Sequence, residues 1–164
     1  MFENRQNGFT LIELIAVVII TGILTAVITA KYNDTGSTAQ REAALRKMIT
    51  DIRFAQQLAL TGGQETRVTI DQPNNRYFLK WEDGTYVKTP VGGQDFIVEF
   101  GTGNFSDVTI SATGFTNGRL DFDRRGVPLN AGTAFSGVLS LVTLNSLKRI
   151  TVTANTGFLR IEDI

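Results

Sequence analysis

Several residue types that commonly carry catalysis and metal binding are missing from this chain. Its 164 residues contain no histidine and no cysteine. This excludes imidazole-based acid–base catalysis, thiol nucleophiles, His/Cys zinc sites and disulfide frameworks. An enzyme of this composition would have to use carboxylates, Lys, Tyr, Ser or Thr, and no trio of Ser, Lys and carboxylate has a spacing that indicates hydrolysis. We therefore expect a protein that is not an enzyme and needs no cofactor.

Two carboxylates could nevertheless share a cation. Asp121 and Asp123 alternate along a predicted strand, so they lie on one face, and carboxylates suit hard cations. The sequence that follows begins like a calcium loop. It departs from that pattern at Arg125, where an oxygen ligand is needed, and at Gly132, where the closing Glu should stand. We expect no metal site here.

Surface recognition has weak support from charge and aromatic content. Sixteen Lys and Arg residues balance sixteen Asp and Glu residues, so no net basic field attracts nucleic acid. The aromatic residues Tyr77, Trp81 and Tyr86 could form a platform for carbohydrate or a partner. Packing within a hairpin explains at least part of that set.

Glu13 is the most unusual ionisable residue, because it is the only charge between Phe9 and Ala30. A carboxylate inside a membrane-spanning helix costs about 2.5–3.5 kcal/mol on insertion scales, so it should have a partner. Cleavage after Gly8 would create an α-amino group on Phe9, four residues before Glu13 and on the same helical face. That amine, from the same or a neighbouring chain, could neutralise the carboxylate. The alternative is that Glu13 lies near the interface and reaches water.

The apolar run around Glu13 predicts a single membrane anchor. A helix over residues 9–30 would be about 33 Å long, which is enough to cross a bilayer. A cleaved secretory signal is the main alternative, but the candidate cleavage sites near Ala26 and Ala30 fit poorly, because Leu24 and Ile28 occupy the positions where small residues are required. Small residues at Gly22, Ala26 and Ala30 and threonines at Thr21, Thr25 and Thr29 could form a face for helix packing in lipid, or could simply fill the helix.

The segment from Gly8 to Leu14, G-F-T-L-I-E-L, resembles the processing site of type IV pilins and type II secretion pseudopilins. The resemblance implies that a prepilin peptidase cuts after Gly8 on the cytoplasmic side, that Phe9 is N-methylated, and that Glu13 pairs with a neighbouring subunit's N-terminus during assembly. It also implies a single-pass inner-membrane protein with a periplasmic C-terminal domain. The implied partners are other pilins or pseudopilins, the peptidase, an inner-membrane assembly platform and membrane lipid.

Beyond the anchor, the pattern predicts one α+β domain: a long helix packed on an antiparallel β-sheet. A loop or locally melted stretch is expected at residues 33–36. Apolar residues then recur at helical spacing, and Gly62 and Gly63 can end the helix. This stripe comprises Leu45, Met48, Ile49, Ile52, Ala55 and Ala59. We divide the chain into a leader (1–8), the membrane and assembly half of the helix (9–30), its amphipathic half (31–63) and a β-rich domain (64–164).

Period-two patterning from Thr66 onward predicts the strands. They are expected at residues 66–70, 76–81, 85–88, 96–100, 108–111, 119–122, 137–142, 149–154 and 158–161. The expected inward-facing residues are Val68, Ile70, Phe78, Phe122, Leu139, Leu141, Ile150 and Val152.

The C-terminal half resembles one branch of this family. The sequence L-D-F-D-R-R-G-V-P from Leu120 to Pro128 is similar to the F-D-x-x-G-x-P element of the GspH/FimT group, and the ending around Asn155 to Gly157 also matches that group. Asp123 can cap a turn that Gly126 completes, so the element is expected to serve structure before chemistry.

The leading interpretation is a structural minor pseudopilin or minor pilin, positioned at or near the tip of a type II secretion pseudopilus or a type IV pilus. The alternative is a DNA-binding minor pilin for DNA uptake. The signature of that group is a C-terminal G-R-x-R, of which this chain keeps only Arg160. Lys148, Arg149 and Arg160 are then the candidate DNA contacts. A membrane-tethered enzyme is the third and least favoured class.

Overall fold

The computed structural model describes the backbone of residues 10–164 and the side chains of residues 10–26 and 38–164. Its first element is the helix α1, which covers Leu11–Gly62, 52 residues, without interruption. The break expected at residues 33–36 was therefore wrong. Single Gly or turn-forming residues cost at most about 1 kcal/mol each within a helix, which longer helices tolerate. The helix ends as expected, with Gly63 in the left-handed region at φ 63°.

The chain divides into two compact units, one up to Thr38 and one from Ala39 to Ile164. In the second unit, α1 buries one face at helical spacing, which confirms the predicted stripe, although Ile49 is only half-buried. The fully buried members of the predicted stripe are Leu45, Met48, Ile52, Ala55 and Ala59, and Ala44, which was not predicted, is buried with them. This face packs in the same hydrophobic core as the strands that follow.

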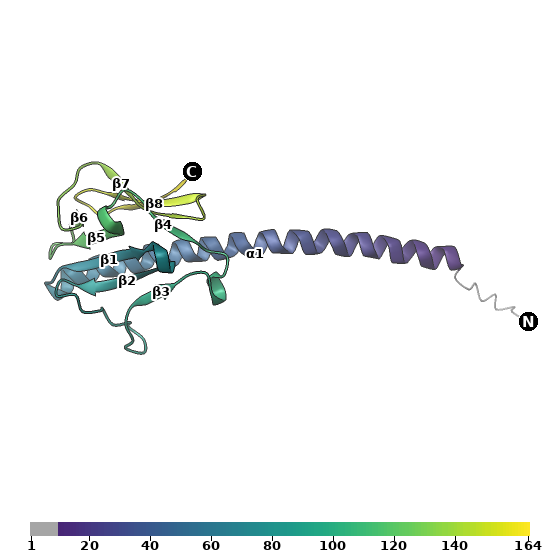
Figure 1. The fold of residues 1–164 in the computed structure, drawn as a ribbon, viewed down its shortest axis with the longest axis horizontal. Helices are drawn as coiled ribbons and strands as arrows, with labels where there is room; N and C mark the ends of the chain where they lie inside the picture. The colour runs from purple at the N-terminus through teal and green to yellow at the C-terminus, as the bar shows by residue number, and fades with distance from the viewer. Residues whose placement is uncertain (1–9) are drawn as a thin grey trace, which may run out of the picture. The chain divides into compact units, whose positions relative to one another are not determined.

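The first sheet has five antiparallel strands in the order β3-β2-β1-β5-β6. Its strands are β1 (Thr66–Asp71), β2 (Arg76–Trp81), β3 (Ile97–Glu99), β5 (Arg119–Phe122) and β6 (Pro128–Asn130). The expected hairpin joins β1 and β2 through a short 3-10 helix, Gln72–Asn74, and Asn75 at φ 48°. Figure 1 shows β1 and β2 lying along the second half of α1.

The second sheet has four strands in the order β4-β7-β8-β9. Its strands are β4 (Ile110–Ala112), β7 (Val138–Leu144), β8 (Lys148–Thr153) and β9 (Leu159–Asp163), and all neighbours are antiparallel. The pairing of β7 with β8 shifts between Ser140 and Val142, which leaves Leu141 as the extra residue of a bulge. Two further 3-10 helices cover Gly103–Phe105 and Thr116–Gly118.

The α+β prediction is confirmed, and most strands lie within a few residues of their expected positions. The strand expected at residues 85–88 was wrong, because that segment forms only isolated bridges, Lys80 with Tyr86 and Lys88 with Asp95. The strand β6 was missed. It begins at a proline, which is acceptable only because β6 is an edge strand and needs no donor at that position.

The predicted core is confirmed except at two positions. Phe78 was wrong, because β2 directs Tyr77 and Leu79 inward while Phe78 lies on the outer face, half-buried. The register explains this: Tyr77 pairs with Ile70 and Leu79 with Val68, and opposed residues share a face. Leu139 faces the core but is only partly buried. The confirmed residues are Val68, Ile70, Phe122, Leu141, Ile150 and Val152.

Candidate functional site

The described part of the N-terminal region begins with a capped helix. The Glu13 N–H lies 3.3 Å from the Thr10 hydroxyl oxygen and donates to the Thr10 carbonyl at 3.1 Å. A Thr three residues before a Glu at a helix start is the capping-box pattern, and the cap was missed from the sequence. Glu13 is exposed in the first turn, where the helix dipole stabilises a negative charge. Gly8 and Phe9 lie outside the described residues.

Large apolar side chains are exposed along the described first half of α1. Their exposed fractions run from 47% at Ile15 to 77% at Leu11. The exposed residues are Leu11, Ile12, Leu14, Ile15, Val17, Val18, Ile19, Ile20, Ile23 and Leu24. Chains normally bury such a surface against protein or lipid.

Two threonine hydroxyls of the same segment form hydrogen bonds within the helix. The Thr21 hydroxyl donates to the Val17 carbonyl at 2.8 Å, and the Thr25 hydroxyl donates to the Thr21 carbonyl at 2.7 Å. These threonines therefore do not need a polar partner outside the helix. Thr29 and Ala30, which complete the predicted packing face, lie outside the described side chains.

Within the portion of the chain that the structure describes, no helix combines the length and apolar character required of a membrane span.

The three candidate DNA contacts lie on two neighbouring strands but do not form one patch. Lys148 approaches Glu42 and Asp163, each at 3.1 Å, and hydrogen bonds to Asp163 and then Glu42 raise the pKa of Lys148. Arg149 is paired with Glu162 at 3.1 Å. Two of the three cations are therefore already balanced by carboxylates.

The strand register separates these cations further. Lys148 and Arg149 are adjacent residues of β8, so their side chains lie on opposite faces of the second sheet. Arg160 stands opposite Thr151, which places it on the Arg149 face, where it is exposed. The structure brings Arg149 and Arg160 to one face and places Lys148 on the other.

The two family-like motifs of the C-terminal half meet at one side chain of α1. The Gln56 amide donates to the Gly126 carbonyl at 2.8 Å and to the Thr156 carbonyl at 3.1 Å. Gly126 belongs to the turn after β5, and Thr156 lies in the turn between β8 and β9. A single helical residue thus links a turn of each sheet.

Asp123 organises the turn after β5 as the sequence predicted. Its carboxylate accepts the Arg125 and Val127 N–H groups, each at 2.9 Å. Burial raises the pKa of Asp123, but the hydrogen bonds from Val127 and Arg125 outweigh it, and the net pKa is lowered. The turn then brings Gly126 against Leu60. The F-D-x-x-G-x-P element is structural in this domain.

Asp121 forms an ion pair with Arg119. It is fully buried on the outer face of the first sheet, where the Arg119 guanidinium donates to it at 2.8 Å. The pKa of nearby Glu65 is raised, first by burial and then by the negative charge of Asp121. Among the described residues, no group of three or more potential ligands could hold a metal ion.

A buried polar contact joins α1 to the first sheet. The Tyr77 hydroxyl donates to Asp51 at 2.5 Å, and Lys47 lies 3.0 Å from the same carboxylate. Burial, followed by the charge and hydrogen bond of Asp51, raises the pKa of Tyr77 far above its usual value. This contact was not predicted from the sequence, because the burial of a tyrosine hydroxyl can be expected only when its acceptor on the facing helix is known.

The proposed aromatic platform does not form. Tyr77 faces the core, and the Trp81 ring packs against Gly62 at the end of α1. Tyr86 instead contacts Phe78 on the outer face, with ring centroids 5.7 Å apart, and Lys80 lies over the Tyr86 ring at 4.5 Å.

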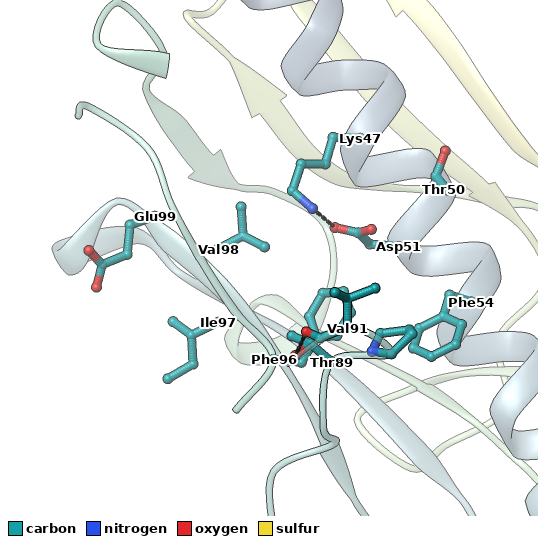
Figure 2. A pocket seen from close by; sticks show the side chains of 11 residues that line it. Lys47, Thr50, Asp51, Phe54, Thr89, Val91, Phe96, Ile97, Val98 and Glu99 are labelled. Atoms are coloured by element: carbon teal, nitrogen blue, oxygen red, sulfur yellow. Dashed lines mark hydrogen bonds and ion pairs between the residues drawn. The ribbon is translucent and has the colours of Figure 1, made fainter. Parts of the chain in front are cut away.

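An open groove lies between α1 and β3, with a volume of about 580 Å³. We call it the edge groove. The Phe54 and Phe96 rings line it and stack on each other with centroids 5.8 Å apart. The remaining lining residues are Lys47, Thr50, Asp51, Thr89, Pro90, Val91, Ile97, Val98 and Glu99. Figure 2 shows Lys47, Asp51 and Phe54 reaching the groove from the helix.

Two known protein families match parts of this sequence. Residues 4–29 match the family described as "Prokaryotic N-terminal methylation motif". Residues 44–157, well over half of the chain, match the family described as "Type II transport protein GspH". The chain belongs to the GspH family. The resemblance to the GspH/FimT group predicted from the sequence is therefore confirmed. Proteins of this family are structural rather than enzymatic.

Two individual proteins are similar to this GspH-family chain. A "Fimbrial protein" of Moraxella nonliquefaciens is 33% identical over 107 residues, which cover 65% of this chain and 55% of that protein. The chain thus spans about half the length of this curated relative. The structure of the minor pseudopilin EpsH from the Type 2 Secretion System of Vibrio cholerae is 15% identical, covers 76% of this chain and 97% of that one, and has a TM-score of 0.49.

Proposed function

We propose that this chain is a structural minor pseudopilin or minor pilin, which assembles at or near the tip of a type II secretion pseudopilus or a type IV pilus and catalyses no reaction. One observation carries the proposal. The methylation motif and the GspH region occur in one chain, and a single helix, α1, runs from the first into the second.

The physical character of α1 supports an assembly role. In its second half, one face is buried in the core of the chain's own domain. In the described first half, apolar side chains such as Leu11 and Ile20 are not covered by any residue that the structure describes. Lipid before assembly and neighbouring helices afterwards would each supply that cover.

The proposed roles of the N-terminal residues follow the family pattern. Prepilin peptidase cuts between Gly8 and Phe9, and Phe9 is N-methylated. Glu13 then pairs with the amine of a neighbouring subunit, which neutralises both charges away from water. Before assembly the chain is a single-pass inner-membrane protein with its C-terminal domain in the periplasm. An inner-membrane platform extracts it into the filament.

Intact-mass analysis of the chain purified from its native membrane tests this assignment. We expect loss of residues 1–8 and the addition of one methyl group. Gly8→Val should leave the leader attached, whereas the neighbouring control Asn7→Ala should be processed normally. A mature chain that starts near residue 27 or 31 would instead identify a cleaved secretory signal and refute the proposal.

A further inference from the structure

The β3 edge of the first sheet presents unused backbone hydrogen-bonding groups. Leu79 donates to the Phe96 carbonyl at 3.1 Å, and Phe100 donates to the Asn75 carbonyl at 2.9 Å, so these residues face β2. Adjacent residues of a strand direct their backbone groups to opposite sides, so Ile97 and Glu99 direct theirs outward.

Only one of these outward groups is used. The Ile97 N–H donates to the Asp95 carbonyl at 2.9 Å. Within residues 10–164, the Ile97 carbonyl and the N–H and carbonyl of Glu99 have no hydrogen-bond partner. An antiparallel strand beside β3 could therefore make up to three backbone hydrogen bonds.

The edge groove lies on the inner side of this open edge. Val98 is on the α1 side of β3, whereas Ile97 and Glu99 point away from it (Figure 2). A residue opposite Val98 on an added strand would share its face and so enter the groove beside Phe54 and Phe96. At about 580 Å³, the groove is large enough for such side chains.

The charges at the edge favour a basic neighbour. Inside the groove, Lys47 and Asp51 balance each other at 3.0 Å. On β2, Arg76 stands opposite Glu99 and interacts with its charge, but the ion pair of Arg76 is with Asp71 at 2.7 Å. Glu99 is exposed and forms no close ion pair with any residue of the described region, so its carboxylate can pair with a basic residue of a strand added on its open side.

We propose that the β3 edge and the edge groove together dock an extended segment of a neighbouring filament subunit by strand addition. That segment carries an apolar side chain opposite Val98, which fills the groove, and a basic side chain opposite Glu99. The proposal rests on the function proposed above, because a filament supplies the neighbouring subunit.

Photocrosslinking of the full chain in its native, filament-forming cells tests the proposal. A benzophenone amino acid is placed at Val91, which is 89% exposed at the rim of the groove. Crosslinked peptides are then mapped by mass spectrometry. Ile20, 57% exposed on the first half of α1, reports filament membership, and Val138, 55% exposed on the second sheet, is the control surface.

Two substitutions at Glu99 separate strand addition from simple proximity. Glu99→Pro removes the outward N–H at an edge position that tolerates proline, and should reduce the Val91 crosslink about tenfold, as expected for the loss of one or two hydrogen bonds. Glu99→Lys keeps the N–H but reverses the charge, and should give a smaller loss. Neither should change crosslinking from Ile20 or Val138.

Each outcome decides the matter. A Val91 crosslink to an extended segment of another subunit, lost in Glu99→Pro, supports the proposal. A Val91 crosslink that withstands both Glu99 substitutions, or crosslinks from Ile20 without any from Val91, would overturn strand addition while leaving the proposed function intact. Absence of crosslinks to other subunits from both Ile20 and Val91 would refute the proposed function and the docking site together.

Discussion

Gly157→Ala should destabilise the domain more than its backbone conformation alone requires. Gly157 has φ 68°, and a Cβ there would lie 2.7 Å from the Gln56 amide nitrogen. The left-handed conformation costs an alanine about 1–2 kcal/mol. Displacing the Gln56 amide also weakens its two hydrogen bonds, each contributing about 0.5–1.5 kcal/mol. The free energy of unfolding should therefore fall by about 2–5 kcal/mol.

Gly137→Ala is the matched control. Gly137 has a similar φ of 74°, but no atom beyond its chain neighbours lies within 4 Å of the position that a Cβ would take. The free energy of unfolding of this variant should fall only by the cost of the left-handed backbone conformation, about 1–2 kcal/mol. Urea unfolding of the full chain in detergent, followed by circular dichroism and by the fluorescence of the single tryptophan, gives both values.

A double-mutant cycle then assigns the excess to Gln56. In a Gln56→Ala background the amide is gone and the Phe122 ring, 3.3 Å from the added Cβ, is the close neighbour that remains, so the cost of Gly157→Ala should fall toward that of Gly137→Ala. Equal losses for the two glycine variants in the wild-type background, or an unchanged cost of Gly157→Ala without Gln56, would refute the reasoning.

Four further results are expected. Glu13→Val should leave the chain inserted in the membrane but impair its incorporation into filaments, measured in sheared fractions; wild-type incorporation would contradict the proposed pairing. Residues 31–164 should fold as a soluble monomer, checked by circular dichroism and amide exchange, because the second half of α1 buries its own stripe. That domain should bind duplex DNA weakly and without sequence preference in anisotropy titrations at physiological salt, and tight binding abolished by Arg160→Ala would instead favour the DNA-uptake function. Because the folded pKa of Asp123 is lowered, its contribution to stability is present above pH about 4 and is lost as the pH falls through the lowered value; Asp123→Asn should flatten that part of the urea-midpoint profile.

Local patterns were sufficient to predict the elements whose two faces differ clearly. The stripe from Leu45 to Ala59 alternates with charged residues at helical spacing, so both the helix and its buried face could be predicted. The β1–β2 hairpin was equally clear, since Pro73 and two asparagines separate two runs rich in strand-forming residues.

The prediction errors arose where a segment is apolar on both faces, or where a residue distant in the sequence determines which side chain is buried. In β2, Tyr77, Phe78 and Leu79 are consecutive, so alternation alone cannot choose the inner face. The inner face follows from the register with β1, and the inward Tyr77 hydroxyl donates to Asp51, a residue 26 positions away in the chain. Phe78 instead packs on the outer face against Tyr86.

In the candidate site, too, features carried by contiguous residues could be predicted, whereas features built from distant segments could not. The motif around Gly8 and Glu13 is contiguous in sequence, so it predicted both the methylation motif and the family. The edge groove combines residues of α1 with a three-residue strand and the loop before it, and no short sequence pattern connects these segments. The link through Gln56 likewise joins turns 70 and 100 residues away.

The double hydrogen bond of Gln56 has a consequence for how this domain tolerates changes in loop length. An insertion near Gly126 or Thr156 would move a carbonyl out of reach of a fixed helical side chain, so the lengths of those two turns are constrained together. The loop over residues 89–94 carries no such link to Gln56, and its exposed residues could accept additional length without disturbing either sheet. The length of the chain beside the β3 edge can therefore vary while the two turns held by Gln56 keep a fixed geometry.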